Sequence, residues 1–216
     1  AKTIPIEDIG MVILDHPRIT ITQGLLSELI ENNAAILNCD QKHMPLGLVM
    51  PMTSNHTYTE KLKQQLDSSE PLRKNLWQQT IKMKILNQAA LLEKQRIPVQ
   101  NMQHWAKHVR SGDPDNLEGR AAAYYWKTIM DDPAFRRGRE EPAPNNLLNY
   151  GYAVLRAIVA RSLVASGMLP ALGIHHKSKY NPFCLADDIM EPYRPFVDQL
   201  VLKVQKDFEK EAIEQL

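Results

Sequence analysis

The spacing of hydrophobic and polar residues differs between the first sixty residues and the rest of the chain. In the first part, short runs rich in β-branched residues are separated by turn-forming residues, a pattern typical of strands. It predicts strands at residues 11–14, 19–21, 35–37 and 46–50, and a short helix at residues 25–30. A turn at residues 40–43 joins the last two strands into a hairpin. We therefore expect a small β-rich module, followed by a polar linker at residues 51–59.

After this linker, apolar residues recur every three or four positions, which is the period of a helix with one buried face. The first such stripe consists of Trp77, Ile81, Ile85, Ala89 and Leu92. A second stripe runs from residue 148 to 163 and stops at a Ser-Gly pair, and a proline at 195 suits the first turn of a last helix. The pattern predicts an α+β protein with a partial β-rich domain over residues 1–58 and a larger α-helical domain over residues 59–216.

The composition is that of a chain that folds without a metal ion or a disulfide. Its 216 residues are 44% hydrophobic and 24% charged, and a chain of this length buries enough surface to fold without metal or disulfide. Cys39 and Cys184 are far apart, which suggests neither a zinc knuckle nor a disulfide framework and suits a reducing compartment. The most apolar stretch, residues 152–174, contains two arginines and a proline, so we expect no membrane span and a cytoplasmic protein.

Charge is concentrated in the middle of the chain. The net charge is +1 overall, but residues 71–110 carry eight basic side chains against one acidic side chain, a net charge of +7. A polyanion would bind such a segment, although a solvated helix face has the same composition. The cations that we predict to contact the phosphates of such a polyanion are Arg73, Lys74, Lys82, Lys84, Arg96, Arg136, Arg137, Arg139, Lys177 and Lys179.

Three segments contain polar groups that a helical bundle does not need. Glu118 opens a helical segment, where it would either act in a site or, with Asp115 as N-cap, complete a capping box. His175 and His176 lie in a polar loop with two lysines. One of the two histidines would bind a metal, or both would be surface residues.

The third segment is acidic. Asp187 and Asp188 lie four and three residues before Glu191, so the three carboxylates share a helix face. They repel one another and would need a cation, unless they form a solvated helix end. Glutamate, histidine and aspartate together suit Mg²⁺ or Mn²⁺, and the lack of cysteine ligands argues against structural zinc.

Four segments in this order resemble one family, the CRISPR-associated integrase-nucleases (Cas1) that capture new spacers, and look most like members from type II systems. The segments are EGRAA at 118–122, NLLNYGY at 146–152, LPALGIHH at 169–176 and DIMEPYRP at 188–195. The likeness covers essentially the whole chain. It implies a small β-sandwich, within which the chain begins, joined to a larger helical domain.

The resemblance also implies a metal site. Position by position, Glu118, His176 and Glu191 match the three ligands of an Mg²⁺ or Mn²⁺ ion, and Asp188 matches an acidic neighbour. Many relatives have aspartate at the last position, so the roles of Glu191 and Asp188 could be exchanged. All four are our predicted catalytic residues.

The implied function is a metal-dependent DNA integrase and endonuclease of bacterial adaptive immunity. The 3′-hydroxyl of a captured duplex, the prespacer, would attack a phosphodiester at the CRISPR repeat. The implied partners are a second copy of the chain in a homodimer, the small bridging protein Cas2, and double-stranded DNA. Two alternatives stay open: a structure-selective DNA repair nuclease with the same ligands, and a catalytically silent DNA-binding scaffold.

Overall fold

A computed structural model describes residues 3–52, 55–130, 134–138 and 141–214, with side chains as far as residue 207. Contacts divide the chain into two compact units. One, the sheet unit, consists of residues 1–68 and 153–187, and the other, the helical unit, of residues 69–152 and 188–216. Helices α6 (Asn145–Ala165) and α7 (Cys184–Met190) each contribute residues to both units.

The sheet unit is built on three strands in the order β1-β2-β3. After the 3-10 helix η1 (Ile6–Asp8), the elements are β1 (Met11–Leu14), α1 (Gln23–Glu31), β2 (Ala35–Cys39), β3 (Pro45–Val49) and α2 (Tyr58–Leu66). Strand β1 runs parallel to β2, and α1 is the crossover that this arrangement requires. Strand β3 returns antiparallel to β2. Leu29, Ala34 and Ile36 form the buried core between α1 and the sheet.

The second half of α6 and the residues after it, 153–187, complete the sheet unit. Gln65 of α2 donates a hydrogen bond to the Leu169 carbonyl at 2.9 Å and accepts one from the Leu169 backbone N–H at the same distance. The Arg161 guanidinium of α6 donates to the Asn33 carbonyl, which follows α1. Helix α6 ends at the predicted Ser-Gly pair, where Gly167 has a φ of 77° that glycine adopts readily.

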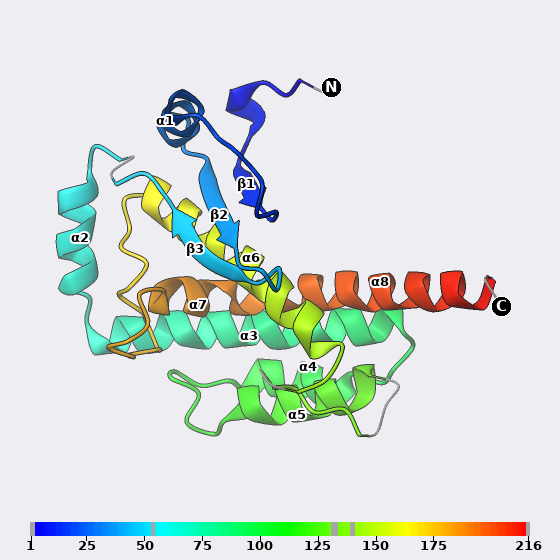
Figure 1. Ribbon diagram of the computed structural model, residues 1–216. Coiled ribbons are helices and arrows are strands. Elements are labelled where there is room, and N and C mark those ends of the chain that lie inside the picture. The colour runs from blue at the N-terminus through cyan, green and yellow to red at the C-terminus, as the bar shows by residue number, and fades with distance from the viewer. Residues whose placement is uncertain (1–2, 53–54, 131–133, 139–140, 215–216) are drawn as a thin grey trace. The chain divides into compact units, whose positions relative to one another are not determined.

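The helical unit is organised around α3 (Glu70–Lys94), the longest helix. Helix α3 packs against α4 (Gln100–His108), α5 (Leu117–Ile129), the 3-10 helix η2 (Glu191–Tyr193) and α8 (Arg194–Glu214), and α8 runs alongside it (Figure 1). All five members of the predicted stripe, from Trp77 to Leu92, are buried. None of the described helices is long and apolar enough to cross a membrane.

The α+β class is confirmed, as are the first strand, the short helix, the hairpin and the main helices. The predicted strand at residues 19–21 is wrong, because these residues lead into α1, whose N-cap is Thr22. Within the described residues the strands form a single sheet rather than two facing ones. The predicted boundary after residue 58 stays a prediction, since each compact unit combines two chain segments.

Candidate functional site

Glu118 lies in the first turn of α5, and its side chain is not used to cap the helix. Asn116 is the N-cap, with a left-handed φ of 49°, and its Oδ1 accepts from the Gly119 N–H at 3.1 Å. Asp113 accepts from the N–H groups of residues 117 and 118, both at 2.9 Å. The capping-box interpretation is therefore wrong. Asp115 instead forms two 2.8 Å hydrogen bonds with Arg110, and the Glu118 carboxylate is left for another partner.

Glu191 is the first residue of η2 and is 5% exposed. Its Oε1 accepts a 2.8 Å hydrogen bond from Nε of Arg194, three residues later. The Asn87 side chain of α3 donates to the Pro192 carbonyl at 2.7 Å, which ties η2 to α3. The backbone that follows Glu191 is therefore tied to the central helix of the unit.

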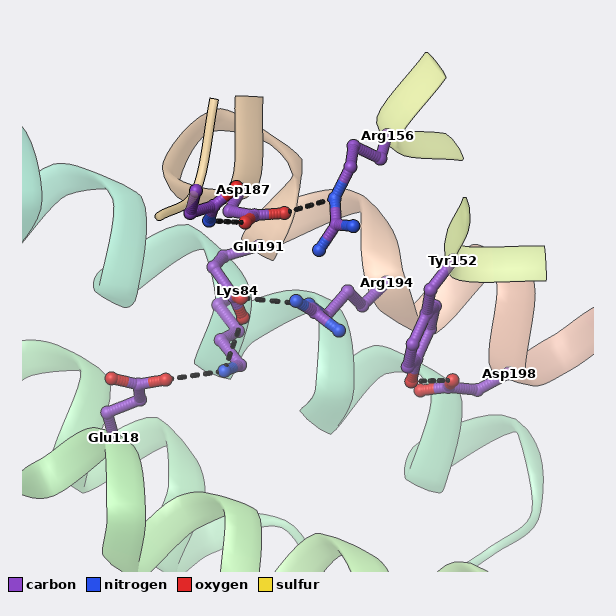
Figure 2. Close-up of polar contacts among 9 residues, drawn as sticks. Lys84, Glu118, Tyr152, Arg156, Asp187, Glu191, Arg194 and Asp198 are labelled. Carbon is purple, nitrogen blue, oxygen red and sulfur yellow. Dashed lines mark hydrogen bonds and ion pairs between the residues drawn. The ribbon is translucent and has the colours of Figure 1, made fainter. Parts of the chain in front are cut away.

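Lys84 of α3 joins the two glutamates. Its Nζ lies 2.6 Å from Glu118 Oε1 and 2.6 Å from Glu191 Oε2 (Figure 2). The contact with Glu191 is an ion pair without hydrogen-bond geometry, because the buried Oε2 accepts no hydrogen bond from the described residues. With Arg194, the group contains two carboxylates and two cations and carries no net charge when all four are ionised. Such compensation is what buried carboxylates require.

The structure thus brings two of the predicted ligands, Glu118 and Glu191, to one ammonium group. Their neighbours Asp187 and Asp188 are also buried, at 6% and 0% exposure, so the solvated helix end is wrong. In the sheet unit, Asp187 accepts a 2.6 Å hydrogen bond from Arg156 Nε (Figure 2). It also accepts one from the Asn181 side chain at 2.7 Å. Protein cations therefore compensate both Asp187 and Glu191.

His176, the third predicted ligand, lies in the sheet unit, in an exposed loop. Its ring packs edge-on against the ring of His175, with 5.4 Å between centroids. Within the described part of either unit, no three histidine, cysteine or acidic side chains gather in a metal-binding group. That His176 joins Glu118 and Glu191 at a metal stays a prediction.

The predicted DNA-contacting cations fall into several environments. Six are exposed: Lys74, Lys82, Arg96, Arg136, Lys177 and Lys179. Arg73 is half-buried, and so is Arg137, which donates to Asn145 at 3.0 Å and Asn149 at 2.8 Å. Arg139 lies outside the described residues. Lys84 needs a correction, because it is 8% exposed and its charge is taken up by two carboxylates.

Sequence reasoning missed the role of Lys84, although the pattern contained a signal. Lys84 lies three residues after Ile81 and seven after Trp77, so the helical period places it on the buried face of α3. A charged residue in an apolar stripe indicates a buried partner of opposite charge. Arg194 could have been found as well, since it follows Glu191 at i+3.

A second buried polar cluster lies beside Arg194, and nothing in the sequence pattern pointed to it. Tyr125 donates a 2.7 Å hydrogen bond to one carboxylate oxygen of Asp198. Tyr152 donates to the other at 2.5 Å (Figure 2). The Arg194 guanidinium lies 4.6 Å from the Tyr152 ring centroid. Burial raises the pKa of Asp198 to about 6, although the tyrosine hydroxyls and nearby arginines act to lower it. Burial likewise raises the pKa of both tyrosines.

Comparison with known proteins identifies the family of the chain. The sequence model of the family described as CRISPR associated protein Cas1 matches residues 1–213. The chain belongs to the Cas1 family. CRISPR-associated endonuclease Cas1 of Neisseria meningitidis serogroup C (strain 8013) is 44% identical over 204 residues, which cover 94% of this chain. The chain spans 66% of the length of that relative. The resemblance predicted from the four motifs is therefore confirmed.

Two solved structures share the fold. A Cas1 protein from Thermotoga maritima aligns with a TM-score of 0.77 and 19% identity, over 96% of this chain and 71% of that chain. A casposase bound to integration product aligns with a TM-score of 0.76 and 23% identity, over 94% of this chain and 62% of that chain. At these identities the likeness shows the Cas1 fold.

Proposed function

We propose that this member of the Cas1 family is a metal-dependent DNA integrase and endonuclease that inserts captured DNA into a CRISPR array. The observation that carries the proposal is the convergence of Glu118 and Glu191 on a single cation in the helical unit. Family membership supports the same reaction class, since the relative from Neisseria meningitidis is named an endonuclease and the structurally similar casposase is bound to integration product.

The two glutamates fit a divalent cation in charge and in donor chemistry. Mg²⁺ and Mn²⁺ prefer carboxylate oxygens, and one oxygen of each glutamate lies 2.6 Å from the same positive nitrogen. Glu191 Oε2 is also a buried oxygen that accepts no hydrogen bond from the described residues. In the proposal, Glu118 and Glu191 hold the metal with His176 as third ligand, and Asp188 is an acidic neighbour.

The proposed reaction is a transesterification. The 3′-oxygen of the prespacer forms a bond to phosphorus at the repeat, the bond to the old 3′-oxygen breaks, and that oxygen leaves with a proton. The number of phosphodiester bonds is unchanged. A bound divalent ion supplies Lewis-acid stabilisation of negative charge on the phosphate and on the attacking or leaving oxygen. With water as nucleophile, the same site would hydrolyse DNA.

The chain's own residues have two tasks in this reaction. Glu118 and Glu191 place the cation, and their anchoring to α5, η2 and α3 limits their movement. The exposed cations, such as Lys82 and Arg96, contact the DNA backbone through charge rather than through base edges. A homodimer and Cas2 would assemble around the same DNA, as the family resemblance implies.

An integration assay tests the proposal. Full-length protein, Cas2, a short duplex with free 3′-hydroxyls and a plasmid carrying the repeat are incubated with Mn²⁺, and joined products are counted. Glu118→Gln and Glu191→Gln should each lower both strand transfer and hydrolysis at least ~100-fold, because each removes a metal ligand. Asp115→Asn, three residues before Glu118, is the matched control and should keep activity. Normal strand transfer by a folded Glu118→Gln protein would refute the proposal.

A further inference from the structure

The Lys84 ammonium occupies the place between the two carboxylates that a metal ion would need. Nζ lies 2.6 Å from one oxygen of each glutamate. A divalent ion of the Mg²⁺ or Mn²⁺ class approaches its oxygen ligands to about 2.0–2.2 Å. A metal ion bound to these two oxygens would need the space that the ammonium group now fills. The two cations cannot occupy it at the same time.

We propose that Lys84 is a built-in cation that holds Glu118 and Glu191 ready in the metal-free protein and leaves when a divalent ion binds. This inference rests on the proposed function, because it concerns the same two glutamates. It adds a positioning residue that the predicted ligand set does not contain. Lys84 competes with the metal and thereby sets its affinity.

Charge gives the reason why Lys84 must leave. Two glutamates, Lys84 and Arg194 sum to zero net charge. A divalent ion added to these four side chains would give them a combined net charge of +2. Departure of the ammonium lowers that net charge to +1 and removes the cation closest to the metal. Repulsion between like charges at such short distances is strong when little water lies between them.

The structure also offers the ammonium a way out. The Glu191 side chain is 7% exposed, whereas the Glu118 side chain is 27% exposed. The group is therefore open to solvent on the Glu118 side. Lysine has a flexible four-carbon stem, which lets Nζ turn towards water while α3 stays in place. Arg194 stays with Glu191, because its Nε donates to Oε1, the oxygen that Lys84 does not contact.

Amine labelling followed by mass spectrometry tests the exchange in the wild-type protein. Metal-free protein and protein saturated with Mn²⁺ are each treated briefly with an acetylating reagent, and modification of Lys84 is measured. Labelling of Lys84 should rise at least threefold with Mn²⁺. Lys82, which is exposed and two residues away, is the internal control and should not change. Equal protection of Lys84 with and without bound Mn²⁺ would overturn the inference.

Lys84→Met tests the competition with a side chain of similar length and no charge. Its metal-free form should unfold roughly 10 °C below wild type, because buried Glu191 and half-buried Glu118 lose a cation. Calorimetry should show that this variant binds Mn²⁺ at least tenfold more tightly than wild type. Bound Mn²⁺ should restore most of the decrease in its thermal unfolding midpoint. Lys84→Arg keeps the charge and should keep wild-type affinity within about threefold. Unchanged or weaker Mn²⁺ binding by Lys84→Met would contradict the competition.

The two proposals fail in different ways. If wild type binds Mn²⁺ through Glu118 but Lys84 stays protected, the inference fails and the proposed function stands. If wild type binds no Mn²⁺, both fail. The labelling needs no variant, so the inference is decided even if Lys84→Met does not fold.

Discussion

Asp198 should make the protein more stable in mild acid than at neutral pH. A variant in which residue 198 cannot ionise should not gain this stability. This carboxyl group is 1% exposed and accepts hydrogen bonds from Tyr125 and Tyr152. Burial raises its pKa from 3.8 to about 6. Each unit of pKa difference between folded and unfolded states corresponds to 1.36 kcal/mol, so ionised Asp198 costs about 3 kcal/mol of stability at neutral pH.

The sign follows from where the proton binds. Between pH 3.8 and about 6 the folded protein keeps a proton on Asp198 that the unfolded chain has lost. The contribution of this group to stability is therefore highest below the unfolded pKa and is lost as pH rises through the folded pKa. Between pH 7.5 and pH 4.5 the two pKa values give a change of about 2 kcal/mol in favour of the acidic condition.

Urea unfolding of wild type and Asp198→Asn at these two pH values isolates the effect. Other titrating groups shift both proteins alike, so the informative quantity is the difference between their free energies of unfolding. Asparagine keeps the size of the side chain and can still bond both tyrosine hydroxyls. The free energy of unfolding of wild type, minus that of the variant, should be about 2 kcal/mol higher at pH 4.5 than at pH 7.5. A gap that is equal at both pH values, or that moves the other way, would refute the reasoning.

Three further predictions concern stability and DNA binding. In α1, the methyl group of Gly24→Ala meets open space, so this variant should stabilise the protein by about 0.5 kcal/mol. In α6, the methyl group of Gly151→Ala would overlap the Val197 side chain of α8 and should destabilise the protein by about 2 kcal/mol. Thermal unfolding measures both effects. Asn116→Ala removes the α5 cap and should cost about 1 kcal/mol in urea unfolding. Lys82→Gln should lower the magnitude of the slope of log DNA affinity against log salt concentration by about one. Lys42→Gln, at an exposed position in the turn of the β-hairpin, should leave this slope unchanged.

Periodicity predicted the main helices because burial of one helix face leaves a repeating pattern in the sequence, as in the stripe from Trp77 to Leu92. It failed at residues 19–21, where β-branched residues precede the N-cap Thr22. The start of α5 shows another limit. Asp113, Asp115 and Asn116 are all suitable caps, and the left-handed backbone of Asn116 decides among them. Sequence spacing does not contain that choice.

The candidate site was found by motif resemblance, not by spacing. Glu118 and Glu191 meet only because α5 and η2 pack against the same helix, α3. Contacts between residues so far apart in the chain leave no local periodic pattern. For His176, the ligand role still rests on the resemblance alone.

Charge reasoning identified the need for a cation but missed which residue meets it. The acidic segment predicts a compensating cation unless it forms a solvated helix end, and Lys84 is among the cations predicted to bind DNA. Lys82 and Lys84 are two residues apart, about 200° around a helix, so α3 directs them to opposite sides. Lys82 is exposed and Lys84 is buried against the glutamates. One basic helix therefore serves two purposes in our proposals, with its outer lysine on the DNA backbone and its inner lysine at the metal site.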